Sequence, residues 1–201
     1  MLLTILMPYL SAFLSIFIAI NAFGKIPSFL VLMERLSHKQ KKRITWQSLL
    51  YAFATTILFA LMGKLLFWIT GVTAFDVKIA GGILLLVLSV NVILRGSVMR
   101  TSHTKKLFPD LGIFPLVTPL IAGPELFTLS LIIFNNFGIL ILTTSLIVNM
   151  VFAWLVLENS DIIIKLIGEK GTAFFSKFAE IVLSVIAIMA IRQGIAETFF
   201  H

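Results

Sequence analysis

The chain of 201 residues contains no cysteine. This absence excludes disulfide bonds, thiol catalysis and cysteine-ligated metal sites. Histidine is also scarce, and none of the three histidines belongs to a histidine cluster, a zinc-protease motif or another catalytic motif. They lie in connections or at the C-terminus, as His38, His103 and His201. The sequence therefore predicts a protein that is not an enzyme and that uses no metal or other cofactor.

Charged residues are few as well. They make up 12% of the chain, whereas 59% of the residues are hydrophobic and the mean hydropathy is +1.08. A soluble domain of this composition would lack the polar residues needed to cover its surface, so the sequence predicts an integral membrane protein. The net charge of +7 does not indicate a nucleic-acid partner, because the basic residues lie mainly between the apolar segments.

Six apolar segments are long enough to cross a bilayer. They cover about 2–33, 46–70, 76–95, 111–134, 137–157 and 178–195. The predicted fold class is an all-α membrane protein with a single transmembrane domain over residues 1–201. The connections after the first, third and fifth segments carry most of the basic residues. By the positive-inside rule this side is cytoplasmic, which predicts a multi-pass protein of the inner or plasma membrane with both termini extracytoplasmic.

The second helix is expected to begin before its membrane-spanning part. Ser37 followed by Gln40 has the pattern of a helix N-cap with a capping box. The basic residues that follow would then lie on a short cytoplasmic extension of the helix.

The first segment contains helix-breaking residues in a run too long for a straight span. A helix over residues 2–33 would be about 48 Å long, whereas the hydrocarbon core is roughly 30 Å thick. Gly24 and Pro27 favour a break within it. Irregular backbone at membrane depth is tolerated where it is buried in protein or lines a wet cavity, so a break marks a candidate substrate site. A simple proline kink is the alternative.

The two halves of the chain resemble each other. Pro27 and Pro124 are 97 residues apart, and the third and sixth segments both begin with Phe-x-x-Lys-x-Ala, at Phe75 and Phe174. Halves of three spans each enter the membrane from opposite sides. The sequence therefore predicts two inverted three-helix repeats, about 1–98 and 109–198, with broken helices in spans one and four. Chance similarity between apolar helices is the alternative.

Two charged residues near the paired breaks are candidates for coupling or for an ion pair. Glu125 is the only acidic residue of the fourth segment, and it follows Gly123 and Pro124 directly. A carboxylate inside the bilayer costs roughly 2.5–3.5 kcal/mol, which makes it a functional candidate. Glu125 would either bind a coupled proton or serve the architecture, by stabilising a helix N-terminus or pairing with Lys25. Both interpretations remain open.

Residues around the two breaks form the predicted substrate-binding set. Its members are Asn21, Gly24, Pro27, Ser28, Thr118, Gly123, Pro124 and Thr128. Hydrogen bonds between helices are the alternative role for the polar members. The pair Gly81 and Gly82 predicts close packing of helices through small residues.

Several of these motifs resemble the MarC family of integral membrane proteins. The resemblance is carried by residues 21–29, 79–84, 115–124 and 194–195. It implies six spans in the inner membrane of bacteria or archaea and a relation to small neutral amino-acid transporters. The chain departs from the family pattern at Ala22, where proline is frequent, and at Glu125, where glycine is usual.

These observations predict a secondary transporter or exporter of small neutral amino acids. The zwitterion would bind between the broken first and fourth spans, with helix N-termini facing its carboxylate. The alternative is a non-transporting membrane scaffold or assembly subunit, which would use its small-residue faces to bind partner helices. The expected partners are the amino acid and the lipid bilayer, and a homo-oligomer is left open.

Overall fold

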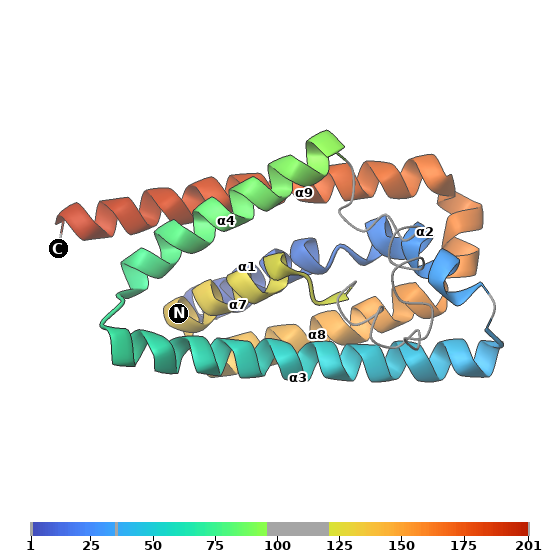
Figure 1. Cartoon of the computed structure of the whole chain (residues 1–201), viewed down its shortest axis with the longest axis horizontal. Helices are drawn as coiled ribbons and strands as arrows, with labels where there is room; N and C mark the ends of the chain where they lie inside the picture. Colours follow the sequence, from blue (N-terminus) through green and yellow to red (C-terminus); the bar gives the residue numbers. More distant parts are fainter. Residues whose placement is uncertain (1, 35, 96–120, 201) are drawn as a thin grey trace.

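The computed structural model describes residues 2–34, 36–95 and 121–200, and the regular structure within these ranges is all helical. Figure 1 shows the helices as an elongated bundle. The helices are α1 (Leu2–Ile20), α2 (Ala22–Met33), α3 (His38–Thr70), α4 (Ala74–Arg95), α7 (Pro124–Phe137), α8 (Ile139–Glu158) and α9 (Ser160–Phe200). The predicted all-α fold class is confirmed.

Five helical segments within the described ranges are long and apolar enough to cross a membrane. They are Leu6–Met33, His38–Thr70, Ala74–Leu94, Ile139–Glu158 and Ser160–Phe199. α7 has 14 residues, and residues 111–120, which belong to the predicted fourth span, lie outside the described residues. The five long segments and α7 correspond in order to the six predicted spans.

Two tryptophans of α3 are placed as expected for the two membrane interfaces. Trp46 and Trp68 are both exposed, and the 22 residues that separate them correspond to about 33 Å of helix. This length is close to the roughly 30 Å of the hydrocarbon core, and tryptophan is enriched at both of its boundaries. Before Trp46, α3 extends to the predicted capping box, in which Ser37 N donates to Gln40 Oε1 at 3.0 Å. That prediction is confirmed.

The start of α3 and the junction of α8 with α9 lie at the same end of the bundle. Lys41 Nζ is 3.8 Å from Asp161 Oδ2, and Lys42 Nζ is 5.8 Å from the ring centre of Trp154. In Figure 1 the first turns of α1 and the last turns of α9 lie at the opposite end. This arrangement is that of a chain with an even number of crossings. Which end faces the cytoplasm stays a prediction of the positive-inside rule.

α9 is much longer than the predicted sixth span. The sequence predicted a connection over 158–177, but a helix begins at Ser160 and continues to Phe200 with a kink at Gly168. Gly168 has a φ of 73°, which glycine adopts without the steric cost that other residues meet. One residue therefore changes the helix direction, and the chain needs no long loop before the sixth span.

α4 and α9 approach each other closely at a glycine. A Cβ atom on Gly82 would lie 2.8 Å from the Ala187 carbonyl oxygen and 3.1 Å from the Ile191 nitrogen, both on the backbone of α9. Gly194 on α9 has a similar position, because a Cβ there would lie 2.9 Å from the Phe75 carbonyl oxygen. The predicted packing through small residues is confirmed at Gly82.

We expect Gly82→Ala to lower the free energy of unfolding by about 1–3 kcal/mol, because the added methyl group meets backbone atoms and pushes α4 from α9. Gly81→Ala is the matched control. Its Cβ would lie 3.1 Å from Thr128 Cγ2 and 3.3 Å from Ile132 Cδ1, which are side-chain atoms that can shift. Thermal unfolding in detergent compares the two variants. Equal losses of stability would contradict a backbone contact specific to Gly82.

Candidate functional site

α1 and α2 meet at Asn21, whose backbone is left-handed with φ 46° and ψ 50°. Asparagine enters this conformation more readily than most residues. Its side chain caps α2, since Oδ1 accepts a hydrogen bond from the Gly24 nitrogen at 3.2 Å. Its Nδ2 donates to Ser176 Oγ of α9 at 3.5 Å. Asn21 therefore joins the two helices of the first span and ties their junction to α9.

The position of this junction corrects the sequence prediction. Gly24 and Pro27 were the predicted breakers, but both lie inside α2. Pro27 has no N–H group and removes one helical hydrogen bond, which a helix in a membrane protein tolerates. The change in backbone conformation occurs at Asn21, where a side chain can cap the helix that follows.

A cavity of about 200 Å³ lies between α2, α4 and α9. Its lining residues are Gly24, Pro27, Val92, Ile93, Ala173, Ser176, Lys177 and Glu180. Gly24 lets α2 and α9 approach each other, because a Cβ atom there would lie 2.7 Å from Ser176 Cβ. Pockets for drug-sized ligands measure about 300–1,000 Å³. The volume of this cavity therefore suits a small solute.

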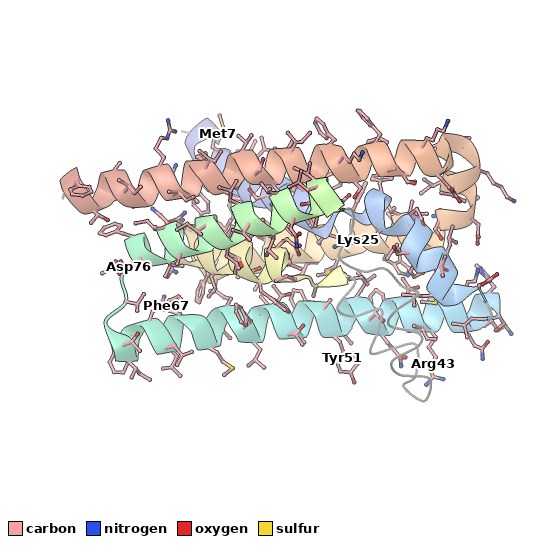
Figure 2. All side chains as sticks on the ribbon, turned by 45° about the horizontal axis from the view of Figure 1, so that its top comes forward. Met7, Lys25, Arg43, Tyr51, Phe67 and Asp76 are labelled. Carbon is pink, nitrogen blue, oxygen red and sulfur yellow. The ribbon has the colours of Figure 1, made fainter. Side chains whose placement is uncertain are left out.

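Three charged side chains from three helices interact near this cavity. Lys25 of α2 is electrostatically coupled to Glu125 of α7 and to Glu180 of α9. Lys25 is half-buried, and Figure 2 shows it well inside the two ends of the bundle. Within the described residues, the salt bridges of 4.0 Å or less all involve other side chains. Lys25 therefore interacts electrostatically with both carboxyl groups but forms a salt bridge with neither.

Glu125 lies in the first turn of α7, which begins at Pro124 with Gly123 as its N-cap. In its architectural role Glu125 was expected to stabilise a helix N-terminus, and the start of α7 at Pro124 provides that N-terminus. The carboxylate of Glu125 folds back over Gly123, toward the N-terminal end of the helix. The exposed N–H groups of a helix N-terminus stabilise a negative charge at this place. This geometry favours the architectural interpretation of Glu125, and its role in coupling stays a prediction.

Glu180 is a site residue that the sequence prediction omitted. The residue is only 8% exposed, and its Oε2 atom is buried without a hydrogen-bond partner. The hydroxyl group of Ser89, on α4, lies next to the same carboxyl group. The signal was present, because Glu180 is the only acidic residue within 178–195. The rule that selected Glu125, that an intramembrane carboxylate is a functional candidate, also selects Glu180.

The other predicted residues are not all gathered at the cavity. Thr128 lines a second cavity of about 430 Å³, with mainly apolar residues of α3, α4 and α7, and its Oγ1 donates to the Pro124 carbonyl at 2.9 Å. Ser28 is half-buried on α2, and Thr118 lies outside the described residues. Of the predicted substrate-binding set, Asn21, Gly24 and Pro27 therefore lie at or beside the smaller cavity, whereas Thr128 lies at the other cavity.

Comparison with known proteins identifies the family to which the chain belongs. The family model described as MarC family integral membrane protein matches residues 6–199. The chain belongs to the MarC family. This membership confirms the resemblance carried by its motifs and, together with the long apolar helices, establishes a multi-pass integral membrane protein.

Curated MarC-family relatives align with almost the whole chain. A UPF0056 membrane protein of Methanocaldococcus jannaschii is 29% identical over 199 residues, which cover 93% of this chain and 95% of that protein. Another from Archaeoglobus fulgidus is also 29% identical, with 94% and 92% covered, and one from Aquifex aeolicus is 26% identical, with 96% and 94% covered. No solved structure matches the chain significantly. The names of these relatives state a membrane location and no substrate.

Proposed function

We propose that this MarC-family protein is a secondary transporter of small neutral amino acids, and not an enzyme. The cavity between α2 and α9 carries the proposal, because its lining includes a buried carboxyl group, Glu180, which is electrostatically coupled to the ammonium group of Lys25. An amino-acid zwitterion would place its ammonium group at Glu180 and its carboxylate toward Lys25. Asn21 and Ser176 add neutral polar groups at the same helix junction.

The pattern of helix contacts supports the predicted inverted repeats. If spans one, two and three correspond to spans four, five and six, the main contacts of one half should have counterparts in the other half. α2 packs on α9 and α8 as α7 packs on α4 and α3, whereas the contact of α7 with α8 has no counterpart of similar extent between the first span and α3 within the described residues. Exchanging the two halves turns α4 into α9 and α3 into α8. The contacts of α4 with α9 and of α3 with α8 are therefore unchanged by the exchange. Asn21 and Gly123 would then mark the breaks in spans one and four.

The two cavities support the same relation. The smaller cavity lies between α2 and residues 173–180 of α9, and the larger one lies between α7 and residues 76–84 of α4, with α3 beside it. Inverted repeats would exchange these two places and open them toward opposite sides of the membrane, as alternating access requires. At the repeat offset of 99 residues, Glu180 corresponds to Gly81. The larger cavity is lined by one carboxylate, Asp76, which accepts hydrogen bonds from Thr73, so the carboxylate that binds the substrate would lie in the smaller cavity.

The proposed orientation has both termini on the extracytoplasmic side of the inner or plasma membrane. The basic start of α3 and the α8–α9 junction, which pair at one end of the bundle, support this orientation. The smaller cavity lies toward the end of α4 and the beginning of α9, and therefore toward the cytoplasmic end.

Counterflow in proteoliposomes tests the proposal. Vesicles that contain only this protein and are loaded with unlabelled alanine should accumulate labelled alanine, glycine, serine or threonine above protein-free vesicles. N-acetylalanine lacks the ammonium group and alaninamide lacks the carboxylate, so neither should inhibit accumulation. No accumulation of any amino acid across a broad panel would contradict the proposal and favour a membrane scaffold or assembly subunit.

A further inference from the structure

We propose that Glu180 binds one proton when the cavity is empty and gives it up for the ammonium group of the substrate, so that amino acid and proton move in opposite directions. The inference rests on the proposed transport of zwitterions and adds the coupling ion and the residue that binds it. A cell that maintains an inward proton gradient would then use this protein for export.

The first observation is an open position on a buried carboxyl group. Glu180 lines the cavity and is 8% exposed, yet its Oε2 atom has no hydrogen-bond partner. A buried carboxylate needs a hydrogen-bonded cation to offset its lost hydration. The position beside Oε2 is therefore suited to a proton or to an ammonium group that enters the cavity.

The neighbouring charges do not fill this position. Lys25 is electrostatically coupled to Glu180 and to Glu125, and no direct salt bridge of Lys25 is found within the described residues. Glu125 adds a like charge, and Lys177, one turn before Glu180, lines the cavity but is exposed to solvent. One half-buried ammonium group is thus shared by two carboxylates.

The other helices packed on α9 bring no free charge to Glu180 among the described side chains. α1 contains no charged residue, and the only one in α8, Glu158, lies 3.7 Å from His38. On α4, Asp76 accepts hydrogen bonds from Thr73. The other described charged side chain of α4 is Lys78, which is paired with Glu197.

The hydroxyl group of Ser89 can form a hydrogen bond with Glu180 in either protonation state. This hydroxyl donates to the Leu85 carbonyl at 2.9 Å and lies next to the Glu180 carboxyl group. A hydroxyl has one hydrogen and two lone pairs. When its hydrogen points to Leu85, its oxygen can accept a hydrogen bond only from protonated Glu180. When Glu180 is ionised, the hydroxyl can turn and donate to the carboxylate.

The exchange is balanced in atoms and charge. The O–H bond of protonated Glu180 breaks, the proton passes to water in the cavity, and the carboxylate accepts a hydrogen bond from the substrate ammonium group. One positive group replaces another at the same oxygen atoms, while the substrate carboxylate faces Lys25. Because both cations need the same position, one proton leaves for each zwitterion that binds.

The pH dependence of alanine counterflow tests this exchange, with equal pH on both sides of the vesicles. If a proton competes with the substrate, the KM of the wild-type protein should rise by up to about tenfold per pH unit on the acid side. Efflux from preloaded vesicles should also accelerate when the outside is made acidic. A KM that stays constant or falls with acidification, while counterflow persists, would contradict the proton exchange but not the proposed transport of amino acids. Absence of counterflow would overturn both proposals.

Two variants assign the effect to Glu180. Glu180→Gln should give a KM that is higher than wild type at neutral pH and independent of pH, whereas Glu125→Gln should keep the pH dependence, whatever its effect on KM itself. If Glu180→Gln does not fold, Glu180→Asp keeps the carboxyl group but shortens the side chain by one methylene, and it should shift the pH at which KM begins to rise. A pH dependence that survives in Glu180→Gln, or that is unchanged in Glu180→Asp, would contradict the assignment.

Discussion

Lys25→Met is expected to raise the KM for alanine counterflow by more than about 30-fold, with the protein still folded in detergent. Lys25 is the ammonium group that couples to both Glu125 and Glu180. Without it the substrate carboxylate would meet the carboxyl groups of Glu125 and Glu180, and the only positive charge left at the cavity would be Lys177, which is exposed to solvent. Removing one partner of a buried charged pair costs roughly 2–5 kcal/mol, which corresponds to this loss of affinity. Initial counterflow rates over a range of alanine concentrations provide the measurement.

Lys165→Met is the matched control for this prediction. It removes the same charge from an exposed position of α9, before the kink at Gly168. We expect its KM to stay within about threefold of wild type, because a solvated charge far from the cavity interacts weakly with the substrate. Size-exclusion profiles and melting temperatures of both variants separate loss of binding from loss of folding. A Lys25→Met protein that keeps the wild-type KM would exclude Lys25 from substrate binding.

Glu197→Gln is expected to lower the free energy of unfolding by about 3 kcal/mol, because it leaves a buried ammonium group without its counterion. Lys78 Nζ lies 2.6 Å and 2.9 Å from the two carboxylate oxygens of Glu197, and Lys78 is 8% exposed. This pair joins the start of α4 to the end of α9. It lies at the end of the bundle away from the smaller cavity, so the main expected loss is stability and not substrate affinity.

A double-mutant cycle checks this pair. Lys78→Met should cost less than Glu197→Gln, since the side chain of Glu197 is 40% exposed and water can replace the lost ammonium group. Lys78→Met combined with Glu197→Gln should also cost less than Glu197→Gln alone, because no charge then stays buried without a partner. Thermal unfolding of the three variants provides the values. Additive losses would show that the two side chains act independently.

Two prolines at matching positions of the two halves have different places in their helices. Pro27 and Pro124 stand at matching places of the two halves, yet Pro124 begins α7 and Pro27 lies in the middle of α2. Proline at the first helical position loses no hydrogen bond, whereas at an interior position it loses one without ending the helix. The difference arises because Asn21 starts α2 before Pro27, through a left-handed backbone and a side-chain cap that the proline pattern does not contain.

The sequence by itself determined the membrane class, the order of the apolar segments, the start of α3 at its capping box and the start of α7 at Pro124. These features depend on composition and on residues within one helical turn, so they can be predicted without knowledge of the fold. Only the tertiary structure decided which polar groups meet. Asn21 and Ser176 are 155 residues apart in the chain, and Lys78 and Glu197 are 119 apart. Such contacts, like the partnerless oxygen of Glu180, depend on how helices distant in sequence pack together, and no local pattern encodes that packing.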